Sequence, residues 1–346
     1  MENNVFEKAE GTLVASRPLN NVGIIYFTSS FSIHGREFEK VAENEVVEVA
    51  QAIKAALGEK GIRAELINLD PTRVVELRKY DWIFSLLEPV VGFPVTDIDI
   101  VEQMESLSIP FTGGGSYALK ATIDKSVTKA EFLKYGIPTP VYDVVYPGDP
   151  ILTKCRFPII VKPVHEDGSV GITKNSITDN STRLTSLVKK IHRLYQQAAL
   201  VEEYIEGREI NAAILGNGKE AVVLPLSEII YPPQLGPKIL TFKSKWKAHS
   251  LDFRASKAKC PGDLDPQVEA QIKEIALQAY QLLRCRDYAR VDFRIRDNVP
   301  YVLEVNPNPC LNPHDAGFVR SGNAAGFTYT ELVNKILEVS VSNNRY

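Results

Sequence analysis

Residues 290–308, Arg-Val-Asp-Phe-Arg-Ile-Arg-Asp-Asn-Val-Pro-Tyr-Val-Leu-Glu-Val-Asn-Pro-Asn, place three oxygen-bearing side chains on two apolar runs. The Asp-Asn pair between the runs predicts a tight turn and therefore a β-hairpin. Side chains two positions apart share a strand face, so Glu304 lies with Asn306 and Arg290 with Asp292. Such oxygens, with no His or Cys nearby, suit Mg²⁺. The hairpin predicts a magnesium site for phosphoryl transfer, and a hairpin with water-facing charges is the alternative.

The composition is that of an ordinary globular protein of 346 residues with a formal net charge of −3. Single cores seldom exceed roughly 250–300 residues, so the chain is long enough for two or three domains. No basic patch favours nucleic acid, and no segment approaches the roughly 20 apolar residues that span a membrane. Four widely separated cysteines fit a reducing compartment. We expect a cytoplasmic protein without nucleic-acid or membrane partners.

The chain divides into an N-terminal arm at 1–19 and three units. Strands expected at 22–27, 64–68 and 82–86, with a helix at 38–57, predict a parallel α/β sheet in the first unit, 20–115. A helix expected at 116–135 opens the second unit, 116–206. Its other expected elements are strands at 159–161, 172–173 and 199–204 and a helix at 182–197. The third unit, 207–346, ends with a helix at 266–283, the hairpin and a terminal helix.

A glycine-containing loop follows the apolar run at 159–161. The segment Lys-Pro-Val-His-Glu-Asp-Gly-Ser-Val-Gly begins at Lys162, and its backbone N–H groups are suited to phosphate oxygens. It matches neither G-x-x-x-x-G-K-[ST] nor G-x-G-x-x-G, which disfavours a P-loop ATPase or an NAD enzyme. An ordinary hairpin with an exposed lysine is the alternative.

Residues 200–209, Leu-Val-Glu-Glu-Tyr-Ile-Glu-Gly-Arg-Glu, resemble a hinge between two units. Its backbone is suited to pair with an adenine edge, with Tyr204 and Ile205 beside the ring and Glu209 reaching the ribose. A solvated acidic turn is the alternative.

These motifs, in this order, resemble the ATP-grasp superfamily and within it the D-alanine–D-alanine ligase family. The resemblance covers about residues 22–340. It rests on Ile-Pro-Phe-Thr-Gly-Gly-Gly at 109–115, Lys125, Gly-Ile-Pro-Thr-Pro at 136–140, Ile-Val-Lys-Pro at 160–163 and Leu-Glu-Val-Asn-Pro-Asn at 303–308. It implies an ATP-grasp fold, in which a Rossmann-like N-terminal domain precedes central and C-terminal α+β domains that clasp ATP. Family members are often dimers, so a homodimer is an expectation.

The resemblance also implies roles for particular residues. ATP would contact Lys125, Lys162, Ser169, Glu202, Glu203, Tyr204, Ile205, Glu209 and Lys245. Asp292, Glu304 and Asn306 would bind two Mg²⁺ ions, which Mn²⁺ can replace. Lys245, in the loop 243–247, would close over the γ-phosphate, and Arg290 would stabilise the oxyanion of the tetrahedral intermediate. In the implied reaction ATP phosphorylates a carboxylate, and an amine then attacks the acyl phosphate.

The departures from the family pattern fall on the amino-acid sites. Glu43 and Glu45 are the nearest candidates for the glutamate that meets the first substrate's amine, and Glu88 is a candidate substrate contact. Trp246 replaces the tyrosine that follows the loop lysine. Asp315 lies near the position of the family's carboxylate-binding serine, where its charge would repel a free carboxylate. We expect an acceptor other than D-alanine, unless the alignment slips by one or two residues.

We therefore predict an ATP-dependent carboxylate–amine ligase that acts on amino-acid-like substrates. Two alternatives stay open, namely a true D-alanine–D-alanine ligase of cell-wall synthesis and a non-catalytic nucleotide-binding accessory module. The second would be expected to lack metal ligands, which this chain retains. His165 and His314 are candidate acid–base groups, but each lies in a loop beside polar residues, and we interpret both as surface histidines.

Overall fold

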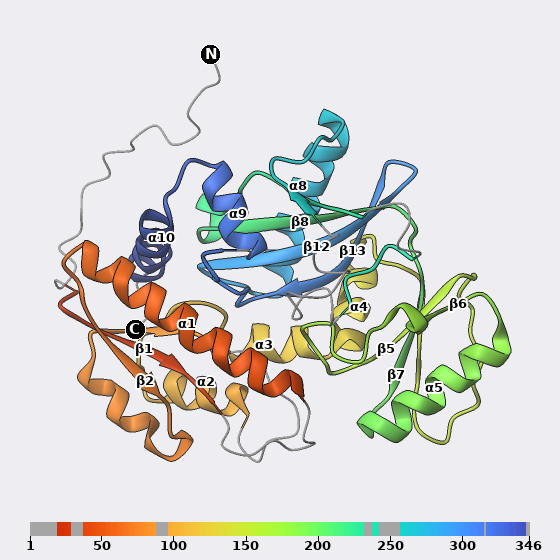
Figure 1. Cartoon of the computed structure of the whole chain (residues 1–346), viewed down its shortest axis with the longest axis horizontal. Helices are drawn as coiled ribbons and strands as arrows, with labels where there is room; N and C mark the ends of the chain where they lie inside the picture. Colours follow the sequence, from red (N-terminus) through yellow and green to blue (C-terminus); the bar gives the residue numbers. More distant parts are fainter. Residues whose placement is uncertain are drawn as a thin grey trace.

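The computed structural model describes residues 19–28, 37–87, 96–231, 237–241, 257–314 and 316–343, with only the backbone of 37–44. Three β-sheets occur in this part of the chain. Figure 1 shows the first sheet and the second sheet at opposite ends of the view, with the third sheet above and between them. None of the described helices has the length and apolar character needed to cross a membrane. No disulfide joins the four cysteines.

The first sheet is parallel, as the sequence predicts. Its elements are β1 (Asn21–Tyr26), α1 (Glu37–Glu59), β2 (Arg63–Asn68), the 3₁₀ helix η1 (Pro71–Lys79), β3 (Trp82–Ser85) and α2 (Asp97–Ser106), with strand order β2-β1-β3. Gly23 lies at the centre of β1, where an added Cβ would come within 2.9 Å of Ile67, Ile83 and Tyr80. The absence of a side chain there lets the neighbouring apolar groups close over the strand.

The helix expected at 116–135 is two helices, so that expectation is wrong. They are α3 (Ser116–Ile123) and α4 (Lys125–Lys134). Asp124 separates them in an extended conformation, and its carboxylate accepts the backbone N–H groups of Ser126 at 2.9 Å and Val127 at 3.2 Å. This N-cap starts a new helix and places Lys125 in its first turn.

The second sheet is antiparallel, with strand order β4-β7-β5-β6. Its strands are β4 (Tyr142–Val145), β5 (Ile159–Pro163), β6 (Ile177–Thr178) and β7 (Ala199–Glu203), and α5 (Ser181–Tyr195) packs on one face. The strand expected at 172–173 is wrong. Thr173 instead begins a 3₁₀ turn, η2 (Lys174–Ser176), because its N–H donates to Ser176 Oγ at 3.0 Å. The strand forms only after this turn.

The third sheet carries the hairpin. Its strands are β8 (Arg208–Leu215), β9 (Val222–Val223), β10 (Ser227–Ile230), β11 (Lys257–Lys259), β12 (Tyr288–Arg296) and β13 (Val299–Asn306), with η3 (Gly218–Glu220) between β8 and β9. The order along the main path is β11-β10-β8-β12-β13. Asp297 and Asn298 have φ of 52° and 62°, which fits the predicted tight turn. Helices α8 (Pro266–Leu282) and α9 (Gly317–Ala324) pack on this sheet, and α10 (Tyr329–Ser342) contacts α9.

Helix α10 completes the core of the first sheet, although it is the last element of the chain. Figure 1 shows it beside α1, and the two helices are in contact. Leu57 of α1 and Leu337 of α10 are buried in one apolar cluster with residues of β1 and β3. Asn334 also donates its side-chain N–H to the backbone oxygen of Ala56 at 3.1 Å. Helices α1 and α10, which are far apart in the sequence, therefore share one core.

Candidate active site

A cavity of about 490 Å³ lies between the second and third sheets. Its walls come from β5, the glycine loop after β5, the segment that joins β7 to β8, and strands β8, β12 and β13. The sequence-predicted residues that line it are Glu45, Lys125, Lys162, Ser169, Glu202, Glu203, Tyr204, Ile205, Glu209, Arg290, Asp292, Glu304 and Asn306. Lys245, Glu88, Asp315 and the side chain of Glu43 lie outside the described residues. Segments distant in the sequence thus meet at one cavity.

The hairpin register brings the three predicted metal ligands together. Asp292 pairs with Glu304, Arg290 pairs with Asn306, and the register shifts just after Asp292. Arg290 donates two hydrogen bonds to the Asp292 carboxylate, at 2.7 and 2.8 Å. Burial lowers the pKa of Arg290, but the adjoining Asp292 carboxylate outweighs burial and raises it. The guanidinium is therefore held as a fixed positive charge at the hairpin.

Asn211 of β8 is a further contact at the hairpin that sequence reasoning missed. It pairs with Asp292 in the β8–β12 ladder and donates its side-chain N–H to Oδ1 at 2.7 Å. The described residues contain no group of three or more His, Cys, Asp and Glu side chains suited to a metal. The site instead offers two carboxylates and the amide oxygen of Asn306. Asp292 Oδ1 accepts hydrogen bonds from Arg290 and Asn211, and Oδ2 accepts from Arg290 and, at 3.4 Å, from Asn306. This donor set fits Mg²⁺ that completes its coordination with phosphate oxygens.

Two lysines reach the cavity from the second sheet and the helix beside it. Lys162, on β5, lies 2.8 Å from Oε1 of Glu202, while Lys125, at the start of α4, donates to the backbone oxygen of Glu166 in the glycine loop. Glu202 also contacts Lys129, which sequence reasoning missed, at 2.6 Å. The Glu202 side chain therefore faces two ammonium groups, and only the backbone and flanking side chains of the hinge remain for an adenine ring.

The hinge after β7 is held by two arginines of β12. Arg294 donates to Glu209 Oε2 at 2.6 Å, and Tyr231 donates its hydroxyl to the same oxygen at 2.7 Å. Burial, followed by the Glu209 charge, raises the pKa of Tyr231 well above its ordinary value, so this hydroxyl stays protonated as a donor. Arg296 pairs with Glu203 at 2.8 Å. Glu209 faces the cavity with one oxygen already engaged.

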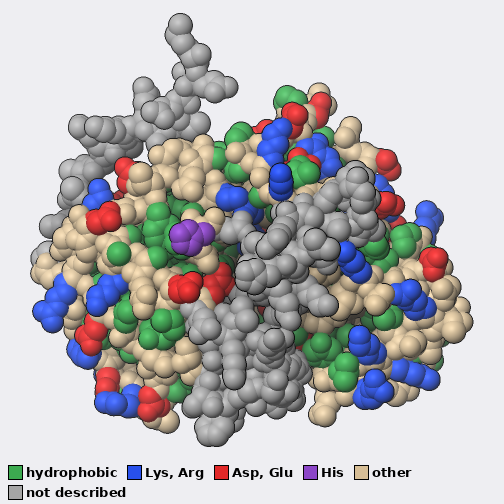
Figure 2. All heavy atoms as spheres, viewed as in Figure 1, with side chains coloured by type: hydrophobic (Ala, Val, Ile, Leu, Met, Phe, Trp, Pro, Cys, Tyr) green, Lys and Arg blue, Asp and Glu red, His purple; other side chains and the backbone are tan. Residues whose placement is uncertain are grey.

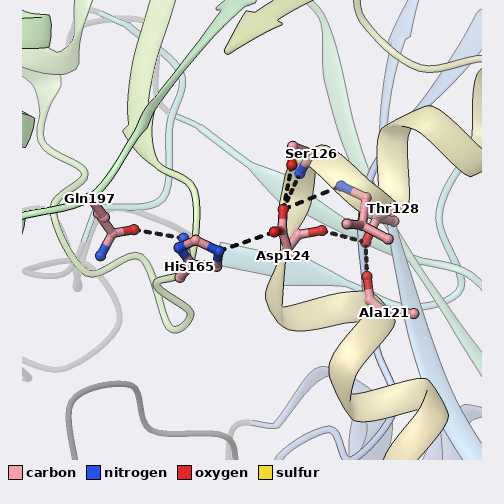
Figure 3. A network of polar contacts seen from close by, with 7 residues as sticks. Ala121, Asp124, Ser126, Thr128, His165 and Gln197 are labelled. Carbon is pink, nitrogen blue, oxygen red and sulfur yellow. Dashed lines mark hydrogen bonds and ion pairs between the residues drawn. The ribbon is translucent and has the colours of Figure 1, made fainter. Parts of the chain in front are cut away.

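The glycine loop is fastened to the start of α4, as Figure 3 shows. His165 Nε2 lies 3.0 Å from Oδ2 of Asp124, and the His165 backbone N–H donates to Gln197 Oε1 at 2.7 Å. Burial raises the pKa of Asp124, but hydrogen bonds from His165 and Ser126 outweigh it and lower the pKa below 3.8. The His165 side chain is 38% exposed in this bridge, and His314 is exposed, so both lie at the surface as expected.

At the other end of the cavity, the first and third sheets meet. Glu45 of α1 accepts a hydrogen bond from Asn312 Nδ2 at 2.8 Å, and Cys310 Sγ lies 3.8 Å from the same carboxylate. The triple glycine is joined to the same loop, because Gly114 donates its N–H to Asn308 Oδ1 at 2.7 Å. Gly113 has φ of +87°, and an added Cβ would come within 2.3 Å of that oxygen. These contacts hold the first domain against the end of the hairpin.

Two sheets that enclose a cavity lined by lysines, a hinge and an acidic hairpin define an ATP-grasp ligase. Residues 143–338 match the family model described as "D-ala D-ala ligase C-terminus". The chain belongs to the D-alanine–D-alanine ligase family of this superfamily.

Individual relatives agree with this membership. An uncharacterized protein, y4sG, of Sinorhizobium fredii is 33% identical over 304 residues, which are 84% of this chain and 87% of that protein. D-alanine–D-alanine ligase of Bordetella avium is 30% identical over 303 residues, covering 86% of this chain and 90% of the relative. The crystal structure of D-alanine–D-alanine ligase from Bacillus anthracis complexed with ATP has a TM-score of 0.74. It is 22% identical and covers 94% of this chain and 98% of the other, which shows the shared fold.

Proposed function

We propose that this protein is an ATP-dependent carboxylate–amine ligase that forms a peptide-type bond through an acyl phosphate and releases ADP and phosphate. The observation that carries the proposal is that Lys125, Lys162, the hinge and the acidic hairpin line one cavity. Phosphoryl transfer needs charge neutralisation around the transferred group and precise positioning of both reactants. The residues around this cavity supply both.

The nucleotide end would be formed by the hinge and the lysines. Tyr204 and Ile205 would flank the base, Glu209 would accept a ribose hydroxyl through its remaining oxygen, and Lys125 and Lys162 would contact phosphates. Ser169, with φ of 65° in the glycine loop, would present the loop backbone to the same phosphates. Lys245 stays a prediction for closure of the cavity.

The metal end would be formed by Asp292, Glu304 and Asn306. Bound Mg²⁺, or Mn²⁺ in its place, would neutralise phosphate charge and hold the nucleotide in line with the carboxylate substrate. Arg290 adds a fixed positive charge two residues before Asp292, and we infer that it stabilises the oxyanion formed when the amine attacks the acyl phosphate. Two ions and the individual ligand roles are part of this proposal.

The amino-acid end supports a substrate with a cationic amine. Glu45 is held at the cavity by Asn312, which fixes its carboxylate where an ammonium group would be attracted. Glu43, Glu88 and Asp315 stay predictions for the same end. We propose that the acceptor differs from D-alanine. The names of the relatives favour a second candidate, D-alanine–D-alanine synthesis, and the retained metal-ligand set weighs against a non-catalytic accessory module.

Side chains of both signs lie on the face shown in Figure 2. Among those drawn in colour, several basic side chains gather at the lower right. The cytoplasmic location, the homodimer and the exclusion of nucleic-acid and membrane partners stay predictions.

The proposal is tested by phosphate release from ATP and Mg²⁺ against single and paired D- and L-amino acids, with mass detection of products. We expect phosphate release and a condensed product with a pair that includes an amine other than D-alanine. Condensation of D-alanine alone would establish the second candidate and refute our inference about the acceptor. Absence of phosphate release across the panel would contradict an amino-acid ligase, and normal binding of ADP in the same preparation would then favour the accessory module.

A further inference from the structure

Lys129 is a buried charge that the proposed mechanism does not use. Its side chain is 1% exposed, and it is not among the described residues that line the cavity. Burying a lysine is costly unless its ammonium group is paired and hydrogen-bonded. Lys129 is both, because its Nζ lies 2.6 Å from Glu202 Oε2 and donates to Thr139 Oγ1 at 2.7 Å. Such a group needs a reason beyond packing.

Glu202 connects Lys129 to the cavity. Its other oxygen, Oε1, lies 2.8 Å from Nζ of Lys162, and the Glu202 side chain is 2% exposed. Burial raises the pKa of Glu202, but the two ammonium groups outweigh burial and lower it, so the carboxylate stays ionised. Burial lowers the pKa of Lys129, and the Glu202 charge at 2.6 Å opposes that shift. With both ammonium groups protonated, two positive charges and one negative charge leave a net positive charge at the phosphate end.

The sign of that charge depends on Lys129. If Lys162 and Glu202 stood alone, they would form a neutral pair, and the carboxylate would oppose an approaching phosphate. Lys129 occupies one carboxylate oxygen and balances its charge, which leaves the positive charge of Lys162 available to the cavity. Because the effective dielectric constant around buried groups is low, these charge–charge interactions are stronger than they would be in water.

Lys129 is also fixed in place from the third sheet. Thr139 donates its hydroxyl to the backbone oxygen of Val302 at 2.9 Å, and Val302 donates its N–H to the oxygen of Pro138 at 2.8 Å. Val302 precedes the predicted metal ligand Glu304 by two residues on β13. The ammonium group also lies 5.7 Å from the centre of the Tyr142 ring. Thr139 therefore connects the cluster of Lys129, Glu202 and Lys162 to strand β13 of the hairpin.

We propose that Lys129 is a positioning residue. It pairs with Glu202, so that this carboxylate does not fully neutralise Lys162, and it thereby keeps the phosphate end of the cavity positive. The inference rests on the proposed function, since it places nucleotide phosphates at Lys162. Lys129 acts through Glu202 and touches neither reacting group.

The test is calorimetric binding of Mg-ADP and of adenosine, which lacks phosphates, to the full chain. Lys129→Met should weaken Mg-ADP binding on the order of 10- to 100-fold, because Glu202 then neutralises Lys162. Adenosine binding should change by less than about twofold, since no charge on this ligand meets the cluster. Lys134→Met, on the exposed side of the same helix, is the matched control and should leave both ligands unaffected.

Lys129→Met removes one of the two ammonium groups that face the buried Glu202 carboxylate and can prevent folding. A second variant therefore tests the inference independently. Lys129→Met with Glu202→Gln removes both charges together and restores the net positive charge to Lys162. We expect its Mg-ADP affinity to lie within about threefold of the wild type. A purely structural role predicts the opposite, with the double variant binding as poorly as the single variant or worse.

Three results would overturn the inference. In the first, Lys129→Met binds Mg-ADP as tightly as the wild type. In the second, Lys129→Met weakens the binding of Mg-ADP and of adenosine equally. In the third, the double variant binds Mg-ADP at least tenfold more weakly than the wild type. Absence of Mg-ADP binding by the wild type would overturn the proposed nucleotide site as well. Since binding needs no turnover, an inactive but ADP-binding enzyme leaves the Lys129 comparison intact.

Discussion

Glu304 faces Asp292 across the β12–β13 ladder and lines the cavity without being a core residue. We expect Glu304→Ala to lower kcat/KM for ATP turnover by about 100-fold or more, because a charged metal ligand is lost. The thermal unfolding midpoint should stay within about 2 °C. Glu338→Ala, which truncates an exposed acid on α10, is the control and should change neither quantity. Turnover in Glu304→Ala at the wild-type rate would refute the metal assignment.

At this scale, sequence motifs locate side chains that belong to short local patterns. The hairpin turn, Lys162 and the hinge acids lie where spacing predicts, because period two and turn chemistry are local properties. Asn211 and Arg294 were missed, since their partners are distant in the sequence and only the ladder register brings them together. Lys129 had one local signal, its position four residues after Lys125 on a helix, but its burial became visible only in the structure.

Among single elements, the start of α4 depends on Asp124. We expect Asp124→Ala to reduce the free energy of unfolding by about 1–2 kcal/mol, because the cap is lost. Asp124→Asn should cost less, since asparagine caps helices well but lacks the charge that faces His165. Thermal and urea unfolding of both variants measure this difference. Equal stability of Asp124→Ala and the wild type would contradict the capping role.

The effect of Asp124 should depend on pH with a defined sign. Its folded-state pKa is lowered below 3.8, so its charge stabilises the fold above that value. The contribution is lost as pH falls through 3.8 towards the lower folded-state pKa. The stability gap between the wild type and Asp124→Asn should therefore shrink as the pH falls below 3.8. A gap that widens below 3.8 would show that another group is responsible.

Element boundaries show why sequence reasoning fails where side chains compete with the backbone. The break at Asp124 lies inside a stretch that continues a helical pattern on both sides, and the choice between interior residue and cap is made by His165 and Ser126. The expected strand at 172–173 was replaced by a turn for the same reason, with Ser176 Oγ as the competing acceptor. The parallel first sheet was predicted correctly because its alternating strands and helices leave few topologies.

For the whole molecule, the triple glycine determines how closely the first domain approaches the hairpin. Gly113→Ala combines a left-handed backbone with a clash against Asn308, whereas Gly136→Ala has a similar φ of +73° and open space around it. We expect Gly136→Ala to cost about 1 kcal/mol in stability and Gly113→Ala at least twice that. Gly113→Ala should also lower kcat/KM, because Asn308 lines the cavity. Equal effects of the two variants on unfolding and turnover would show that the close approach is unimportant.

The domain boundaries at 20–115, 116–206 and 207–346 stay a prediction, although each of the three sheets lies within one of these ranges. The sequence could not show that the last helix packs on the first sheet, because apolar periodicity identifies a buried face without naming its partner. That packing is visible in the cluster that joins Leu57 to Leu337.

The shared core of α1 and α10 has a consequence for biosynthesis. Trp82 donates its indole N–H to Ser340 at 3.2 Å, so the first sheet obtains a contact from a residue that is synthesised 258 positions later. The N-terminal segment emerges from the ribosome early but lacks part of its apolar cover until the last helix arrives. A nascent chain truncated before residue 329 should expose this surface and be a substrate for holding chaperones. Emergence of α10 from the ribosome, rather than completion of the first sheet, is then the step at which this core can first close.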